Sequence, residues 1–286
     1  MIRVKKKIRR IALALALILV VVWAIWENQT LVRTDYEVVS SNLPQAFEGY
    51  RIVQVSDLHN TQFGDSNERL LDMIRDAKPD MIAITGDIID SRSTRVEIAL
   101  AFAREAVKIA PCYYVTGNHE IRDEELDALL NGLRTAGVIV LRGEAVELCK
   151  EGQYIRLVGI DDPSLISRME DLEEVEDIGE LESGITQQML EEFQPHHYTV
   201  LLAHKPFAVY GDLGFDLTLT GHNHGGQIRL PWLGGLYAQG KFFPEYDGGL
   251  FRQGDMAMVV SRGLGNSLFP LRIYNRPEVV VVTLRK

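Results

Sequence analysis

The stretch Met81-Ile-Ala-Ile-Thr-Gly-Asp-Ile-Ile-Asp90 decides the fold. Residues 81–85 are apolar or β-branched and predict a buried strand that ends at Gly86 and Asp87. A helix pattern over residues 94–109 comes next, and the same order of strand, polar strand end and helix occurs at 51–77 and at 112–136. Repeated βα units of this kind predict parallel strands with helices packed against the sheet.

The second half of the chain contains more strands than helices. Strand-like runs lie at 138–141, 145–149, 155–160, 199–203, 217–220, 256–261 and 278–284, with a short helix at 186–193. An edge strand is expected at 36–39. These elements predict an α/β fold in which two sheets pack face to face with helices outside. We expect one domain over residues 45–286, preceded by a linker over residues 27–44.

Charge is distributed unevenly along the chain. The first ten residues hold six cations and no acid, so the rest of a chain with a formal net charge of −10 carries −16. Such an acidic surface repels phosphate backbones, and no nucleic-acid partner is expected. Eight carboxylates lie within residues 170–182, which indicates either a solvated insertion or an acidic lid or partner-binding loop.

An unbroken apolar run, residues 11–26, follows the basic tail of residues 1–10. As a helix the run is ~24 Å long, and the flanking cations can extend to the headgroups. No small-x-small cleavage site follows it, which favours an uncleaved membrane anchor over a cleaved signal peptide or a buried soluble helix. The cations before the run predict a single-pass cell-membrane protein with a cytoplasmic N-terminus and an extracytoplasmic domain.

Two further features leave alternatives open. Cys112 and Cys149 both lie in strand-like runs, which favours two free thiols in the core over one disulfide. Residues 225–253 are rich in glycine with scattered aromatic residues, and we expect long loops there. Their apolar side chains form either a rim that touches lipid or an acyl chain, or ordinary loop packing.

Polar side chains follow five of the predicted strands at the point where each strand ends. They are Asp57 and His59, Asp87, Asn118 and His119, His204, and His222 and His224. Ligands bind beyond the carboxyl ends of strands in such sheets, and residues two apart on an extended segment point the same way. Oxygen and imidazole ligands without thiolate suit Mn, Fe or Zn, and the set is about the right size for two divalent ions. Two ions ~3.5–4 Å apart can clamp a phosphoryl group and lower the pKa of a bridging water.

Five sequence blocks stand in the order typical of the calcineurin-like metallophosphoesterases, which the chain resembles over residues 57–224. The blocks are Asp57-Leu58-His59, Gly86-Asp87-Ile88-Ile89-Asp90, Gly117-Asn118-His119-Glu120, His204 and Gly221-His222-Asn223-His224. The tail, from 260 to 265 and from 275 to 278, is similar to a bacterial membrane-associated branch of that family. The resemblance implies a four-layer α/β/β/α sandwich of two mixed sheets, the metallo-dependent phosphatase fold, here preceded by one transmembrane helix.

The resemblance also implies roles for the strand-end residues. One metal ion is expected on Asp57, His59, Asp87 and His224, and the other on Asp87, Asn118, His204 and His222, with Asp87 bridging and manganese favoured. His119 is expected to contact the phosphate or to protonate the leaving oxygen as the catalytic acid. Two neighbours keep two interpretations each: Asp90 either orients a histidine or caps a loop, and Glu120 either supports the ligands or begins a helix.

The function that follows is a membrane-anchored phosphodiesterase. It would hydrolyse a phosphodiester or pyrophosphate of an envelope or lipid-linked substrate through a hydroxide that bridges two divalent metal ions. The alternatives are an enzyme similar to the pyrophosphatases of UDP-linked diacylglucosamine, a phosphomonoesterase, and a non-catalytic, metal-stabilised membrane scaffold.

Overall fold

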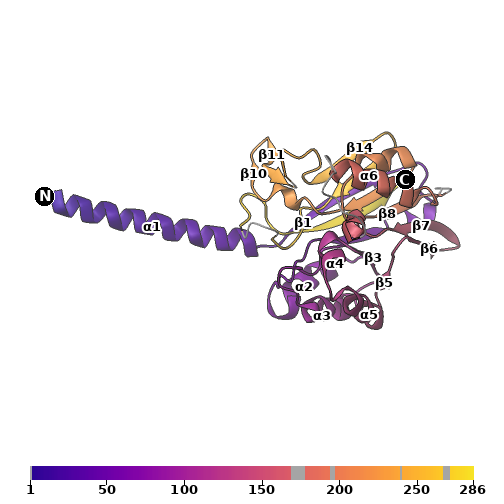
Figure 1. Ribbon diagram of the computed structural model, residues 1–286, viewed down its shortest axis with the longest axis horizontal. Helices are drawn as coiled ribbons and strands as arrows, with labels where there is room; N and C mark the ends of the chain where they lie inside the picture. Colours follow the sequence, from indigo (N-terminus) through magenta and orange to yellow (C-terminus); the bar gives the residue numbers. More distant parts are fainter. Residues whose placement is uncertain (1, 169–177, 194–196, 239, 267–270) are drawn as a thin grey trace.

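The structure is a computed structural model that describes residues 2–168, 178–193, 197–238, 240–266 and 271–286 (Figure 1). Its first sheet has the strand order β1-β16-β2-β3-β4-β5. These strands are β1 (Val32–Val39), β16 (Glu278–Arg285), β2 (Arg51–Val55), β3 (Met81–Thr85), β4 (Cys112–Val115) and β5 (Ile139–Val140). Strands β2 to β5 run parallel, so their carboxyl ends lie at one edge of the sheet.

The second sheet has the strand order β14-β15-β9-β8-β7-β6. Its strands are β14 (Gly249–Gln253), β15 (Met256–Val260), β9 (Leu217–Thr220), β8 (Thr199–Leu202), β7 (Gln153–Gly159) and β6 (Glu144–Lys150). The four central strands are parallel, and the outer strands β14 and β6 are antiparallel to their neighbours. Both sheets are therefore mixed, as expected.

Helices cover the outer faces of the two sheets. The first sheet packs against α2 (Glu68–Asp76), α3 (Val96–Ala106) and α5 (Leu126–Ala136), and the second against α6 (Ile178–Leu190) and the 3₁₀ segment Ala208–Leu213. In Figure 1, α2, α3 and α5 lie at the bottom of the domain, and α6 lies in its upper part near β14. The expected four-layer α/β/β/α arrangement is confirmed.

Strand alternation explains why the layers stack in this order. Along β3, Ile82 and Ile84 belong to the core beneath the helices, whereas Met81 and Ala83 face the space between the sheets. Leu219 of β9 enters the same inter-sheet core from the opposite side. A strand that is apolar on both faces must be covered twice, and successive side chains point to opposite faces.

The segment expected as a linker, residues 27–44, contains β1 instead. The expected edge strand at 36–39 begins earlier, at Val32, and pairs with β16 over eight residues. Exposed side chains alternate with half-buried ones along most of β1. Because the exposed positions include the charged residues Arg33, Asp35 and Glu37, the sequence does not show the apolar run that is typical of a strand. Charged side chains of this kind are typical of a protected sheet edge.

Two helix starts also differ from the sequence interpretation. The sequence favours Ser66 as the N-cap of the helix that follows β2, but α2 begins at Glu68 after a 3₁₀ turn (Asp65–Asn67), and no side-chain hydrogen bond caps its start. Instead Asn67 Oδ1 accepts a hydrogen bond from Phe63 N. Helix α6 begins at Ile178, earlier than the expected residue 186. Of the acidic segment 170–182, residues 170–177 lie outside the described residues.

Residues 225–253 are more ordered than the long loops that we expected. They contain two short hairpins, β10 (Arg229–Leu230) with β11 (Gly234–Gly235) and β12 (Tyr237–Ala238) with β13 (Lys241–Phe242), before β14 begins. Strands of two residues are too short to produce a period in the sequence.

Both cysteines are free thiols, as favoured from the sequence, but only Cys112 is buried. The expectation that Cys149 lies in the core is wrong. It lies on β6, an edge strand of the second sheet, where alternate side chains face solvent.

Helix α1 (Ile2–Gln29) projects from the domain (Figure 1). Its portion Lys6–Gln29 is long and apolar enough to cross a membrane, and none of its most apolar window is buried. Its last turn contacts the C-terminal segment: Glu27 pairs with Arg276 (3.1 Å), and Asn28 Oδ1 accepts from Arg272 N (2.8 Å). Because β1 begins at Val32, only two residues separate this helix from the first sheet.

Candidate metal centre

The strand-end residues meet where the carboxyl ends of β2, β3 and β4 face those of β8 and β9. Backbone hydrogen bonds hold the segments together: His59 N donates to Asp87 O (3.0 Å), and Gly221 N donates to His204 O (2.9 Å). Asn118 and His119 begin the short helix α4 (Asn118–Arg122) directly after β4. One edge of the sandwich therefore gathers side chains from five strands.

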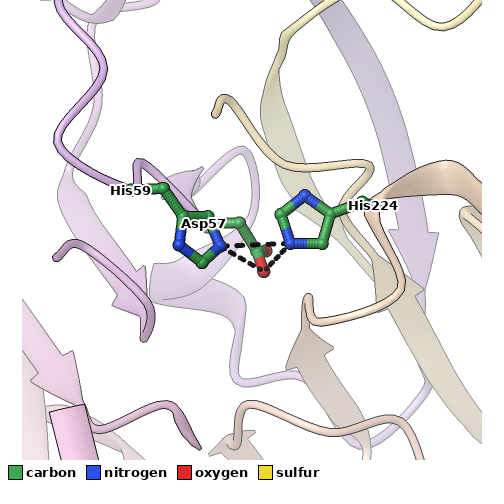
Figure 2. Close-up of side chains that lie close together, drawn as sticks. All are labelled: Asp57, His59 and His224. Carbon is green, nitrogen blue, oxygen red and sulfur yellow. Dashed lines mark hydrogen bonds and ion pairs between the residues drawn. The ribbon is translucent and has the colours of Figure 1, made fainter. Parts of the chain in front are cut away.

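The first cluster consists of Asp57, His59 and His224, whose ligand atoms all lie within 4.8 Å of one another (Figure 2). Nε2 of His59 and Nε2 of His224 are 3.1 Å apart, and the latter lies 3.2 Å from Asp57 Oδ1. Two ring nitrogens at ~2.1 Å from one ion and at right angles would be ~3.0 Å apart, which matches this spacing.

The second cluster consists of Asp87, His204 and His222. Nδ1 of His222 lies 3.1 Å from Nε2 of His204, and the same His204 atom lies 3.1 Å from Asp87 Oδ2. On its other nitrogen, His204 Nδ1 is 2.8 Å from the carbonyl oxygen of Thr85, which can accept its proton. That hydrogen bond leaves Nε2 as the ring nitrogen that faces the cluster.

Asp87 connects the two clusters. Its Oδ2 lies 3.1 Å from Nε2 of His204 and 3.6 Å from Nε2 of His59, which belongs to the first cluster. Its Oδ1 accepts a hydrogen bond from His119 N (2.8 Å), which fixes the orientation of the carboxylate. A single carboxylate between two sets of imidazoles is suited to bridge two cations.

The backbone is strained at the site. Asp57, His59, Asp87, His222 and His224 all have positive φ, between 45° and 72°. Residues with a side chain rarely adopt this region, and each one costs on the order of 1–3 kcal/mol that the surrounding structure must supply. Five such residues in one site indicate that the fold holds these side chains in a fixed arrangement.

Glycines make room for the ligand side chains. A Cβ atom at Gly117 would lie 2.2 Å from Asp87 Oδ1, and one at Gly221 would lie 2.3 Å from Asp57 Oδ2. A Cβ atom at Gly263 would likewise lie 2.7 Å from Asp57 Cβ. The glycines that the sequence places beside the ligand blocks are thus required for close approach.

Electrostatics differ between the two clusters. Burial lowers the pKa of His59 and of His224 to about 3, so both rings are neutral at pH 7, the form that binds metal. Burial acts in the same direction on His204, but the carboxylate of Asp87 overcomes it and raises the pKa of His204 to about 10. The first cluster therefore presents neutral rings, whereas the second holds a proton between His204 and Asp87.

Unsatisfied polar atoms test whether the site fits metal ions. Asn118 Oδ1 and His59 Nδ1 are buried and have no hydrogen-bond partner among the described residues. An amide oxygen without a partner is costly in the interior and is explained if it coordinates a cation. Together with the converging imidazoles and carboxylates, this oxygen makes a donor set that fits divalent metals.

His119 lies beside the two clusters, in a third group with His59 and Asp90. Its ring contacts that of His59 edge to face, with centroids 4.5 Å apart. The backbone N–H of Ser91 donates to His119 Nδ1 (3.1 Å), so the neutral ring carries its proton on Nε2. The side chain remains partly exposed, as a proton donor to a bound ligand must be.

The structure decides between the two interpretations of Glu120. Its carboxylate is buried and accepts from the backbone N–H groups of Asp87 (2.8 Å), Ile89 (3.1 Å) and Gly117 (2.7 Å). It therefore supports the ligand segments and also stabilises the start of α4. Burial, followed by the charge of Asp87, raises the pKa of Glu120 to about 8.

Asp90 is mainly a loop cap. Its Oδ1 accepts from Arg92 N (3.0 Å) and Nε (2.9 Å), and its Oδ2 accepts from Arg92 Nη2 (2.6 Å). The same Oδ1 lies 3.4 Å from His119 Nδ1, so the carboxylate also limits the position of that ring.

Two supporting residues were missed in the sequence. Ser91 fixes the His119 tautomer, and Arg272 is fully buried, with its Nη2 3.3 Å from His224 Nδ1. The Arg272 guanidinium also donates to the carbonyl oxygens of Gly265 and Arg262. The sequence signals neither residue, because a serine in a loop and an arginine in a tail are usually exposed.

Comparisons with known proteins agree with this geometry. The family model described as calcineurin-like phosphoesterase matches residues 50–226. The uncharacterized metallophosphoesterase YkuE of Bacillus subtilis is 31% identical over 91% of this chain and 87% of its own length. Phosphodiesterase YaeI of Escherichia coli is 28% identical over 82% of each chain.

The name of a third relative refers to a membrane. The transmembrane protein with metallophosphoesterase domain of Danio rerio is 28% identical over 88% of this chain and 57% of its own length. Proteins with this domain bind two divalent metals and hydrolyse phosphoesters. The family match over more than half of the sequence, around a site that fits metal ions, leads to one conclusion: this chain belongs to the calcineurin-like phosphoesterase family.

Proposed function

We propose that the protein is a membrane-anchored phosphodiesterase with two divalent metal ions, manganese favoured. The observation that carries this proposal is the position of Asp87 Oδ2, within 3.6 Å of an imidazole nitrogen of each cluster. Asp57, His59, Asp87 and His224 would hold one ion, and Asp87, Asn118, His204 and His222 the other. The similarity to Phosphodiesterase YaeI favours a diester over a monoester.

The chain's own side chains divide the remaining work. When bound, two divalent cations supply positive charge for phosphoryl oxygens and lower the pKa of water. His119, which accepts the Ser91 N–H on Nδ1, presents Nε2–H to the substrate and can donate a hydrogen bond to a phosphoryl oxygen or to the leaving oxygen. Glu120 holds the backbone of the Asp87 and Gly117 segments in place while this happens.

The proposed substrate is a phosphodiester or pyrophosphate of the cell envelope, including lipid-linked ones. The support is indirect and comes from α1, whose apolar stretch would keep the domain at a membrane surface. Cations before that stretch favour a cytoplasmic N-terminus and an extracytoplasmic domain. The transmembrane relative also favours anchoring.

The activity can be tested on the full chain purified in detergent without chelator. We expect hydrolysis of bis-p-nitrophenyl phosphate with Mn²⁺, loss of turnover in EDTA, and about two metal ions per chain by elemental analysis. Asp87→Asn serves as the inactive control. Faster turnover of p-nitrophenyl phosphate would replace the diesterase with a phosphomonoesterase, and two bound metals without turnover of either ester would favour a scaffold.

The two cysteines provide a test of topology. Cys149 is exposed, whereas Cys112 is buried and burial raises the pKa of its thiol to about 12. A membrane-impermeant maleimide should therefore label Cys149 in right-side-out vesicles and not in inverted ones. Cys149→Ser is the matched control and should remain unlabelled in both. Labelling in inverted vesicles alone would place the domain in the cytoplasm and overturn the proposed orientation.

A further inference from the structure

The two short hairpins carry large exposed apolar side chains, in the turn of the first hairpin and at the end of the last strand of the second. Trp232 is fully exposed, and Leu233, Phe242 and Phe243 are 67%, 70% and 53% exposed. Trp232 and Phe243 also have positive φ, 66° and 52°, an unfavourable backbone conformation for an aromatic residue. Neighbouring exposed apolar side chains on a soluble domain mark an interaction surface. We call these four residues the aromatic tips.

The base of the hairpins is fixed by polar contacts. Arg229 Nη1 pairs with Asp247 Oδ2 (3.1 Å), and that carboxylate also accepts from Gly235 N. Asn223, which lies between the two ligands His222 and His224, donates from Nδ2 to Tyr246 O (2.7 Å). The aromatic tips are therefore presented on a structured support that is continuous with the metal centre.

Trp232 and Leu233, in the turn of the first hairpin, lie next to the place where α1 leaves the domain. The ring of Tyr274 contacts the ring of Trp23 in α1, with centroids 5.7 Å apart. Tyr274 lines the same surface hollow as Trp232 and Leu233. Figure 1 likewise shows β10 and β11 at the end of the domain from which α1 projects. The tips thus lie level with the end of the apolar stretch of the helix.

The end of α1 is held against the domain, which sets the height of the tips. The guanidinium of Arg276 stacks over the ring of Trp26 at 4.0 Å and pairs with the buried carboxylate of Glu27. Asn28 makes two hydrogen bonds to the backbone of Arg272: its Nδ2 donates to the carbonyl oxygen, and its Oδ1 accepts from the backbone N–H. With these contacts in place, the domain cannot turn the tips away from a membrane that α1 crosses.

We propose that the aromatic tips insert into the headgroup region of the same bilayer that α1 crosses, so that the domain contacts the membrane at two places. This inference rests on the proposed membrane anchoring. Tryptophan and phenylalanine beside a membrane-spanning helix are suited to this region, where their rings replace water with lipid. The exposed Lys241, on hairpin strand β13 beside Phe242, adds a cation for phosphate headgroups.

Tryptophan fluorescence can test the insertion, because the chain has three tryptophans. The double variant Trp23→Phe/Trp26→Phe keeps Trp232 alone and is reconstituted as the full chain in phosphatidylcholine vesicles. We expect lipids brominated on their acyl chains to reduce the emission of Trp232. We also expect acrylamide in the water to quench Trp232 less in vesicles than in the unfolded protein without detergent. The control variant lacks the three native tryptophans and carries Tyr154→Trp, an exposed position at the start of β7. Its emission should respond to acrylamide and not to brominated lipid.

A further variant separates this inference from the anchoring itself. Trp232→Phe keeps Trp23 and Trp26, whose emission must fall with brominated lipid if α1 crosses the bilayer. Quenching of Trp23 and Trp26 without quenching of Trp232 would overturn the insertion and leave the anchoring intact. Protection of Trp232 from both quenchers would also overturn it, because the tips would then be covered by a second copy of the chain or by another protein segment.

Discussion

The two ligand clusters depend on different parts of the chain. The second cluster is supported locally, by Thr85 and Glu120 at the ends of neighbouring strands. The first cluster depends on the C-terminal segment: Gly265 N donates to Asp57 O (2.6 Å), and Arg272 lies against His224. The support of the second cluster thus comes from the ends of β3 and β4, whereas the support of the first includes a C-terminal segment more than two hundred positions from Asp57 in sequence.

The comparison implies that the two ions respond differently to mutation. Changes at the junction, Asp87, should affect both ions. Changes in the C-terminal segment should affect only the ion of the first cluster. Changes at His119 should affect neither ion and only the reaction.

The largest effect is expected for Asp87→Asn. The amide removes the charge that lies between the clusters, so both metal ions should be lost and diester turnover should fall ~10³-fold or more, corresponding to about 4 kcal/mol of lost charge stabilisation. Elemental analysis and kcat measurements test this. Asp76→Asn, the same change on the exposed face of α2, is the control and should keep both ions. Retention of two ions by Asp87→Asn would show that no single carboxylate joins the clusters.

His119→Ala should be next in size. Loss of the Nε2–H hydrogen-bond donor should lower kcat by ~10²-fold or more while KM and metal content stay close to wild type. Ser91→Ala keeps the backbone N–H that donates to His119 Nδ1 and is the matched control, with kcat expected within about tenfold. Loss of either metal in His119→Ala would assign the histidine to a cluster instead of to the reaction.

Arg272→Met should distinguish the clusters. Without the guanidinium, the Gly265 carbonyl and His224 lose their partner, and the affinity for one of the two ions should fall ~10- to 100-fold. A titration with Mn²⁺ should then show one weakened and one unchanged site. Arg285→Met removes an arginine whose ion pairs are exposed and should change neither. Equal weakening of both sites would contradict the division between local and C-terminal support.

The smallest effect concerns Glu278, which binds Arg262 in the same C-terminal segment (2.7 Å). Burial raises the pKa of Glu278, but the hydrogen bond and charge of Arg262 outweigh burial and bring it below its ordinary value. A carboxyl with a lowered pKa stabilises the fold above its unfolded pKa of ~4.3, and this contribution disappears as the pH falls through the folded value.

Glu278→Gln should therefore lower the free energy of unfolding by about 1–2 kcal/mol at pH 7. The difference from wild type should shrink when the pH is lowered below ~4, because the wild-type carboxyl is then protonated as well. Denaturant titrations at the two pH values measure this. A difference that stays constant with pH would mean that the charge of Glu278 contributes nothing to the C-terminal segment.

The sequence predicts the locally supported cluster better than the other. The strand ends at Asp87 and Asn118 follow uninterrupted apolar runs, so hydrophobic patterning alone places them at one sheet edge. The same patterning gives the position of Asp57 and His224, but not the contact of Arg272 with His224. Arg272 is buried against the carbonyl oxygens of Gly265 and Arg262 in its own irregular tail, which has no hydrophobic period.

Strand β1 and the hairpins show the other limit of patterning. Strand β1 is amphipathic only in part, because charged residues occupy alternate positions. Its sequence therefore resembles a linker, and only its pairing with β16 shows that it is a strand. The hairpins β10 to β13 depend on turns and on the Arg229–Asp247 pair, not on a hydrophobic period. Periodicity finds elements that bury a full face, and these elements bury little.

The two-residue connection between α1 and β1 limits the reach of the enzyme. A long flexible tether would let the domain sample a volume of solution, and the local concentration of any target would fall with tether length. Here the catalytic edge stays at one height beside the end of α1, so for an anchored protein the search for substrate becomes lateral diffusion in two dimensions. Phosphoesters within that layer are encountered repeatedly, and those beyond it must first diffuse to the surface.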